Sequence, residues 1–231
     1  MDEQAQSQDQ DKQSDQRQVK HQGKPALYFR GTNYVGSYPD RETAPDVGDV
    51  PLIAFTGRSN SGKSSLISAL CDHKNLAYVS GTAGKTRSLT YFHVPGETRA
   101  PDGAPPYPEL YLVDMPGFGF AKLNRPERAR LRALADDFLL NESRIRLIVV
   151  VLDARRSLEG EEQNILNYCR TTGRSLVFAR TKWDKLNARE KKDARARWKK
   201  EGITKECLPI SSTKKTGLNR LLLDIRDLLS Q

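Results

Sequence analysis

Residues 57–64 read Gly-Arg-Ser-Asn-Ser-Gly-Lys-Ser, which has the spacing G-x-x-x-x-G-K-[ST] of a phosphate-binding loop. In such a loop, backbone N–H groups surround the phosphates, a lysine reaches their outer oxygens and a hydroxyl ligates Mg²⁺. The flanks fit, because residues 52–55 form an apolar run suited to a buried strand and residues 64–70 have helical apolar spacing. A helix that begins there directs its positive end toward the phosphates. The predicted nucleotide contacts are therefore Gly57, Arg58, Ser59, Asn60, Ser61, Gly62, Lys63, Ser64 and Ser65.

Three further polar motifs each follow a predicted strand. They are Asp114-Met115-Pro116-Gly117, Thr181-Lys182-Trp183-Asp184 and Ser211-Ser212-Thr213. An aspartate in the first position can hold Mg²⁺ through water, and the N–H of Gly117 can contact the γ-phosphate. The order of the motifs along the chain, each after a strand, predicts that they line one nucleotide site.

The second of these motifs favours guanine over adenine. Guanine presents N1–H and N2–H₂ as adjacent donors, and one carboxylate, here that of Asp184, accepts both. Adenine offers an acceptor at N1, so the aspartate would be left unpaired at a cost of several kcal/mol. We expect Lys182 to lie along the base and residues 211–213 to approach the guanine carbonyl through their N–H groups. An ATP-dependent kinase shares the phosphate-binding loop, but Asp184 argues against it.

Strands and helices alternate through most of the chain. The apolar patterns predict strands at residues 52–55, 89–94, 110–113, 145–152, 175–179 and 207–210. Helices are predicted at 64–70, 125–140, 161–170, 188–201 and 218–229. The pattern indicates one α/β domain over residues 26–231, with a mostly parallel sheet of about six strands, helices on both faces and ligands at the carboxyl ends of the strands. Residues 1–25 are polar without an apolar pattern and are predicted to be disordered, and the proline-rich residues 95–108 to form a loop.

Composition narrows the class of protein further. The chain has 231 residues, of which 37% are hydrophobic, and no apolar run approaches the roughly 18 residues that a membrane span requires. The N-terminus lacks the charged start and apolar core of a secretory signal. Cys71, Cys169 and Cys207 lie far apart, which argues against a zinc site or a disulfide framework. We expect a cytoplasmic, monomeric protein with reduced thiols and no membrane span.

The basic excess behind the net charge of +9 is concentrated in residues 182–205, where the only acids are Asp184, Glu190, Asp193 and Glu201. The bases there are Lys182, Lys185, Arg189, Lys191, Lys192, Arg195, Arg197, Lys199, Lys200 and Lys205. A patch of one sign attracts polyanions, and we expect RNA rather than DNA as the partner. The alternative is an ordinary solvated helix face. Trp198 within this helix fits a core residue better than a base-stacking platform.

The motifs together resemble those of the EngB family of bacterial GTPases, which belongs to the Era-like superfamily. The resemblance spans residues 27–229 and is carried by GRSNSGKSSL at 57–66, GKT at 84–86, DMPGFGFAK at 114–122, TKWDKL at 181–186 and SSTKKTG at 211–217. It implies a P-loop GTPase with bound Mg²⁺ and GTP or GDP. It also implies a role in late assembly of the large (50S) ribosomal subunit, with effects on cell division and septation.

The resemblance also implies a switch segment at Gly84, Lys85, Thr86, Arg87 and Ser88, in which Thr86 joins Ser64 on Mg²⁺. Two positions depart from the family, which usually has Pro at position 83 and Gln at position 87, where this chain has Ala83 and Arg87. Residues 95–108 also form a longer loop than is usual. A structural GTP-binding scaffold at the septum is the alternative function.

Hydrolysis would depend on Lys63, Thr86 and Gly117. Ras-like enzymes orient the attacking water with a glutamine directly after that glycine, whereas this chain has Phe118, which cannot hydrogen-bond through its side chain. We therefore predict slow unassisted turnover, at or below about 10⁻⁴ s⁻¹. Asn60 has two alternative roles: in related proteins an asparagine here helps to bind K⁺ beside the phosphates, or it only stabilises the loop.

Overall fold

The computed structural model describes residues 28–73, 76, 87–96, 106–118 and 123–230. The predicted disordered tail at 1–25 lies outside the described residues. So do Gly84, Lys85 and Thr86 of the predicted switch segment, residues 119–122 and much of the 95–108 loop.

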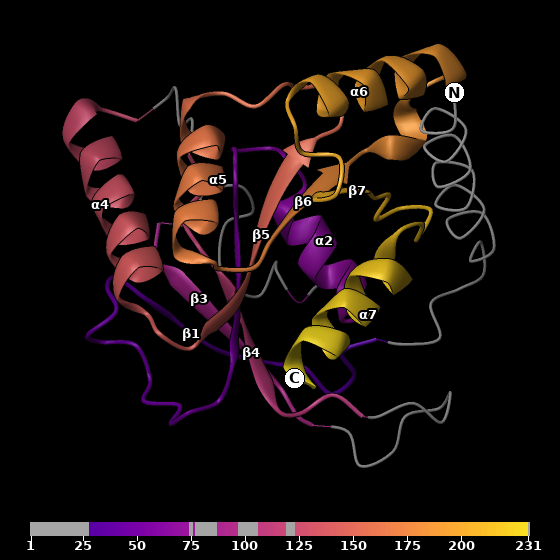
Figure 1. Ribbon diagram of the computed structural model, residues 1–231. Coiled ribbons are helices and arrows are strands. Elements are labelled where there is room, and N and C mark those ends of the chain that lie inside the picture. Colours follow the sequence, from indigo (N-terminus) through magenta and orange to yellow (C-terminus); the bar gives the residue numbers. More distant parts are fainter. Residues whose placement is uncertain (1–27, 74–75, 77–86, 97–105, 119–122, 231) are drawn as a thin grey trace.

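A seven-stranded sheet forms the centre of the fold (Figure 1). Its strands are β1 (Asn33–Tyr38), β2 (Leu52–Gly57), β3 (Leu89–Val94), β4 (Leu110–Asp114), β5 (Ile145–Asp153), β6 (Leu176–Thr181) and β7 (Cys207–Pro209). Their order is β1-β3-β4-β2-β5-β6-β7. The pairs from β4 to β7 are parallel, and β3 is antiparallel to both of its neighbours. The predicted mostly parallel α/β sheet is confirmed.

Strand β1 is the one that the sequence patterns did not identify, so the sheet has one strand more than the predicted six. It lies at the edge of the sheet and pairs only with β3, with a register shift between Tyr34 and Gly36. Most of its residues are exposed. An edge strand of this kind lacks the continuous apolar run by which the buried strands were recognised.

The helices begin and end within about two residues of their predicted positions. They are α2 (Lys63–Leu70), α4 (Arg125–Asn141), α5 (Gly160–Thr172), α6 (Ala188–Lys200) and α7 (Leu218–Leu229), with a short 3₁₀ turn at Trp183–Lys185. Side-chain caps fix the starts of α4, α5 and α6, and at α5 the side chain of Glu162 accepts from the N–H of Glu159. The side chain of Asn124 accepts from the N–H of Glu127 at α4, and Asn187 and Glu190 form a reciprocal capping box at α6.

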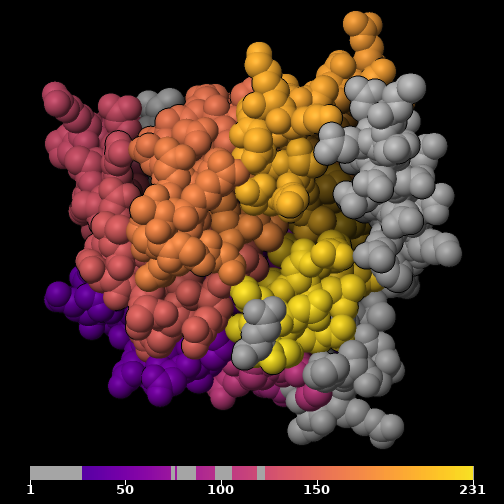
Figure 2. Space-filling model, viewed as in Figure 1, coloured from indigo at the N-terminus to yellow at the C-terminus, as the bar shows by residue number. Residues whose placement is uncertain are grey.

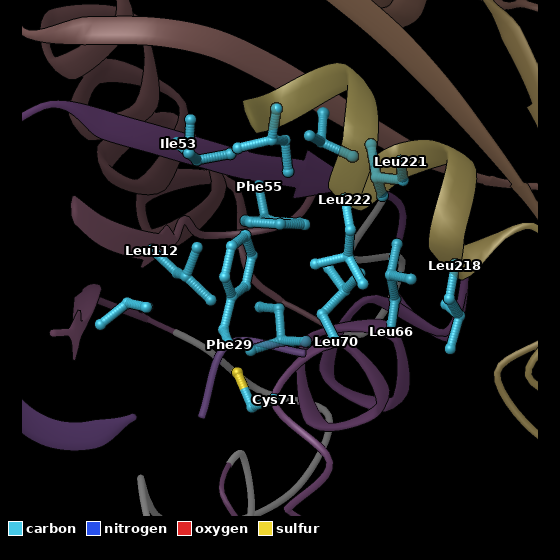
Figure 3. Close-up of a cluster of buried hydrophobic side chains, with 14 of the residues drawn as sticks. Phe29, Ile53, Phe55, Leu66, Leu70, Cys71, Leu112, Leu218, Leu221 and Leu222 are labelled. Carbon is cyan, nitrogen blue, oxygen red and sulfur yellow. The ribbon is translucent and has the colours of Figure 1, made fainter. Parts of the chain in front are cut away.

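Two apolar clusters join the helices to opposite faces of the sheet. Helices α2 and α7 cover one face, and α4, α5 and α6 cover the other. Figure 3 shows part of the first cluster, labelled at Phe29, Ile53, Phe55, Leu66, Leu70, Cys71, Leu112, Leu218, Leu221 and Leu222. The three cysteines form no disulfide with one another, and burial raises the pKa of Cys71 to about 12.

The parallel strands β2, β4, β5, β6 and β7 run in one direction, so the loops at their carboxyl ends meet at one edge of the sheet (Figure 1). The phosphate-binding loop and the other predicted motifs all follow these strands. Within the described part of the chain, none of the helices has both the length and the apolar character needed to cross a bilayer.

Candidate nucleotide-binding site

The phosphate-binding loop joins β2 to α2 in a conformation that only small residues allow. Gly57 has φ 150°, and a Cβ built on it would lie 2.2 Å from the carbonyl oxygen of Val151 in β5. Asn60 and Gly62 also have positive φ, at 63° and 95°. Gly62 leads directly into the first turn of α2, where Lys63, Ser64 and Ser65 follow. The start of this helix therefore faces the predicted phosphate position.

Lys63 and Asp114 form a buried ion pair at the centre of this edge. The two residues are 8% and 2% exposed, and the Lys63 ammonium contacts Oδ1 of Asp114. Burial lowers the pKa of Lys63 to about 7, because removal from water penalises the charged form. The adjoining carboxylate opposes this effect and favours the cation, as phosphate oxygens would. The structure thus brings together the predicted phosphate-binding lysine and the predicted Mg²⁺ carboxylate.

The segment after β4 lies directly on the phosphate-binding loop. Phe118 donates its N–H to the carbonyl of Gly57 over 3.1 Å and accepts from the N–H of Ser59 over 3.2 Å. Met115 is fully buried among core side chains, and its N–H bonds the carbonyl of Phe55. The side chain of Met115 therefore belongs to the core. Pro116 and Gly117 bridge the two ends of this segment.

The second motif also holds the phosphate-binding loop. The hydroxyl of buried Thr181 donates to the carbonyl of Ser61. Lys182, in the left-handed conformation at φ 59°, donates to the carbonyl of Asn60 over 2.8 Å and pairs with Asp153 at 3.2 Å. The phosphate-binding and base-recognition loops therefore form one connected unit.

Asp184 is exposed at this edge and oriented by the loop after β7. A hydrogen bond from Ser211 lowers the pKa of Asp184, and Thr213 adds a second donor at 3.4 Å. The N–H of Ser211 donates to the carbonyl of Thr216, and the N–H of Trp183 to that of Ile210. Ser211 thus positions Asp184. The other two residues predicted to reach the guanine carbonyl, Ser212 and Thr213, follow Ser211 in the same loop.

The motifs did not identify three acidic residues that hold the site together. Arg58 binds Glu162 over 2.8 Å and Glu159 over 2.7 Å, at the start of α5. Burial would raise the pKa of Asp153, but hydrogen bonds from Arg155 and Lys182 hold this pKa well below its usual range. An acid at the end of the longest apolar strand could have marked Asp153, whereas no sequence signal marks Glu159 or Glu162.

The described end of the predicted switch segment is tied to α4. Arg87 forms an ion pair with Glu127 at 2.5 Å, and its carbonyl accepts from Arg130 over 3.4 Å. Ser88 follows it, immediately before β3. Arg87, one of the two residues that depart from the family pattern, therefore contacts α4, the helix that follows the Asp114–Gly117 segment.

The oxygen donors near Lys63 suit Mg²⁺. Ser64 lies in the first turn of α2 and Asp114 ends β4, and Mg²⁺ takes hydroxyl, carboxylate and water oxygens. Ser64 would hold the ion directly and Asp114 through water, and the ion would neutralise phosphate charge. The further predicted ligand, Thr86, lies outside the described residues. Elsewhere among the described residues, no cluster of three His, Cys, Asp or Glu side chains suits a metal ion.

Comparison with known proteins agrees with this geometry. A family model described as 50S ribosome-binding GTPase matches residues 52–182. A probable GTP-binding protein EngB of Maridesulfovibrio salexigens is 36% identical over 173 residues, which cover 75% of this chain and 79% of the relative. Another, of Anaeromyxobacter sp. (strain Fw109-5), is 38% identical over 176 residues, covering 75% and 80%.

Two solved structures share the fold. The crystal structure of a probable GTP-binding protein EngB has a TM-score of 0.55 at 23% identity, covering 78% of this chain and 98% of that chain. The crystal structure of Aquifex aeolicus Era bound to GDP·AlF₄⁻ has a TM-score of 0.56 at 23% identity, covering 79% and 57%.

The sheet, the phosphate-binding loop and the matched family model define a P-loop GTPase domain. The sequence relatives identify the family within this class of GTPases. This chain belongs to the EngB family of GTP-binding proteins.

Proposed function

We propose that this protein binds GTP and GDP and hydrolyses GTP slowly on its own. The observation that carries the proposal is the connected edge on which Lys63 and Asp184 are held. Lys182, in the loop that carries Asp184, donates to the carbonyl of Asn60, in the loop that precedes Lys63, over 2.8 Å. Calorimetric titration tests the selectivity: GTP and GDP should bind, and ATP should bind far more weakly. Equal affinity for ATP would refute guanine recognition and favour a kinase.

Slow hydrolysis follows from the residue after Gly117. The Phe118 backbone is bound to Gly57 and Ser59, and its side chain packs against the core. The side chain at this position cannot orient water, so charge neutralisation by Lys63 and Mg²⁺ and the backbone donors would carry the reaction. A multiple-turnover assay without any partner should give at most about 10⁻⁴ s⁻¹. A rate near one per second would contradict this assignment.

The proposed partner is the large ribosomal subunit, and the proposed contact is its RNA. Two observations support this partner: the match to a family described as 50S ribosome-binding GTPase, and the charge of α6. Its exposed side chains Arg189, Lys192, Lys199 and Lys200, termed the basic face, form no ion pair with an acidic group of the described residues. Figure 2 shows α6 at the outer surface of the molecule. We place this activity in the bacterial cytoplasm, where ribosome supply would link it to cell division.

Salt dependence and charge reversal test the docking surface. Four contacts to single-stranded RNA predict a slope of about −3 in a plot of log affinity against log salt concentration. Reversal of Lys192, Lys199 and Lys200 to Glu should abolish co-sedimentation with purified large subunits. Reversal of three exposed arginines elsewhere, Arg128, Arg132 and Arg146, is the matched control and should leave it intact. Equal loss in both variants would show a nonspecific charge effect, and equally tight binding of polyglutamate would indicate an acidic protein partner.

A further inference from the structure

The half-buried side chain of Trp183, in the motif at residues 181–184 that is predicted to recognise the base, packs against residues of α6. Its ring centroid lies 5.4 Å from that of buried Trp198, with an interplanar angle of 36°. Two cations of the same helix lie over the Trp183 ring: the Arg195 guanidinium carbon at 5.5 Å and the Lys191 ammonium at 5.9 Å from the centroid. Both distances are within the range of cation–π attraction. Lys191 and Arg195 therefore help to hold this indole, together with Trp198.

Trp183 is also placed between the two residues that act on the nucleotide. Lys182 precedes it and binds the phosphate loop, and Asp184 follows it as the predicted guanine carboxylate. All three belong to one tight turn, whose N–H at Trp183 is fixed to the carbonyl of Ile210 over 3.1 Å. A shift of the indole would thus move Lys182 and Asp184 with it.

The same two cations are continuous with the basic face. Arg195 is exposed and lies three residues after Lys192 and four before Lys199, so the three side chains are neighbours on the helix surface. Lys191 lies one turn before Arg195. By contrast, Arg197 points inward and donates to the carbonyl of Ala154 over 3.1 Å. A polyanion on the basic face would therefore also meet Lys191 and Arg195.

We propose that RNA bound on α6 accelerates release of the guanine nucleotide through Trp183. Phosphate oxygens attract Lys191 and Arg195 more strongly than an indole ring does, and they withdraw both cations from Trp183. The turn that carries Lys182 and Asp184 then loses two of the contacts that hold it, and GDP dissociates faster. To the extent that this faster release lowers the affinity for GDP, linkage requires GDP to lower the affinity for RNA by the same factor. The coupling rests on the proposed function, since it requires both nucleotide and RNA to bind.

The test is the dissociation rate of a fluorescently labelled GDP from the full chain, with and without saturating oligouridylate. Loss of two cation–π contacts predicts that the RNA raises this rate about five- to thirtyfold. Replacement of Lys191 and Arg195 by Gln should raise the rate similarly without RNA and remove the response to it. Replacement of Arg128 and Arg132 by Gln is the charge-matched control on α4, far from α6 (Figure 1), and should behave as the parent.

Tryptophan emission gives a second readout, because Trp183 and Trp198 are the only two tryptophans of the chain. Addition of oligouridylate should change their emission in the parent and not in the Lys191/Arg195 variant. Oligouridylate that binds without altering GDP release, or that slows it, would overturn the coupling and leave the docking surface standing. Absence of oligouridylate binding would overturn both the coupling and the RNA contact, and absence of GDP binding would overturn the nucleotide assignment itself.

Discussion

Replacement of Asp184 by Asn changes one acceptor oxygen into a donor where guanine presents two donors. The carboxylate is ionised at neutral pH, since Ser211 lowers its pKa, and it would accept from N1–H and N2–H₂ together. Hydrogen bonds to a charged group contribute about 1.5–3 kcal/mol each. The amide oxygen of the asparagine still accepts one neutral hydrogen bond of about 0.5–1.5 kcal/mol, so the net loss is about 2.5–4.5 kcal/mol and GTP should bind roughly 10²- to 10³-fold more weakly.

Xanthosine triphosphate distinguishes lost recognition from lost folding. Xanthine has a carbonyl at C2 in place of the amino group, so it offers one donor and one acceptor to the side-chain amide that Asp184→Asn introduces. The variant should therefore bind xanthosine triphosphate at least about tenfold more tightly than GTP. Asp184→Ala, which has neither group, should bind both weakly. Because Asp184 is exposed but accepts hydrogen bonds from Ser211 and Thr213, the unfolding free energy of each variant should fall by no more than about 1.5 kcal/mol.

Calorimetric titration of the parent and both variants with the two nucleotides gives the affinities needed. Unchanged GTP affinity in Asp184→Asn would refute the role of this carboxylate. So would xanthosine triphosphate that binds the parent as tightly as GTP does.

Three further predictions concern the surrounding contacts. Arg58→Gln leaves fully buried Glu162 without its ion-pair partner, so urea unfolding should show that the free energy of unfolding falls by about 3 kcal/mol. Glu159→Gln changes a side chain that is 55% exposed and should lower this free energy by less than about 1 kcal/mol. The pKa of Asp153 is lower in the folded than in the unfolded chain, so its carboxylate stabilises the fold above about pH 4. This contribution is lost as the pH falls toward the folded-state pKa. Asp153→Asn should therefore flatten the decline of the unfolding free energy below about pH 4. A K⁺ ion at the exposed side chain of Asn60 predicts faster GTP hydrolysis in KCl than in NaCl at equal ionic strength, abolished in Asn60→Ala, and equal rates would leave Asn60 with its structural role.

The parts of the site that could be predicted from sequence are those in which backbone geometry dictates residue type. Gly57 must be glycine because β5 passes 2.2 Å from the position of a Cβ, and Lys63 must follow the loop at fixed spacing. The clearest of the predicted strands, β2 and β5, are buried on both faces and read as apolar runs. These constraints act within a few neighbouring residues, so one sequence displays them.

The missed features depend on contacts between segments far apart in the chain. Arg58 and Glu162 are separated by 104 residues, and no local sequence pattern at either residue indicates that the two form a pair. Strand β1 pairs through backbone groups with little burial of its side chains. The packing of Trp183 requires α6 to lie beside the turn at residues 182–185. The position of α6 depends in turn on how its buried residues Trp198 and Ala194 pack against the sheet. Tertiary packing, rather than local preference, decides each of these.

The connection between the two loops bears on how nucleotide binding energy is divided. Thr181 and Lys182 bond Ser61 and Asn60, so the turn that carries Asp184 and the loop that carries the phosphate N–H groups move as one unit. Contacts to the base would then help to order the phosphate loop, and contacts to the phosphates would help to order the base turn. Substitutions in the two loops should therefore be non-additive in their effect on GTP affinity, as expected for groups in one hydrogen-bond network. The same rigidity is what would let a disturbance at Trp183 reach the phosphates.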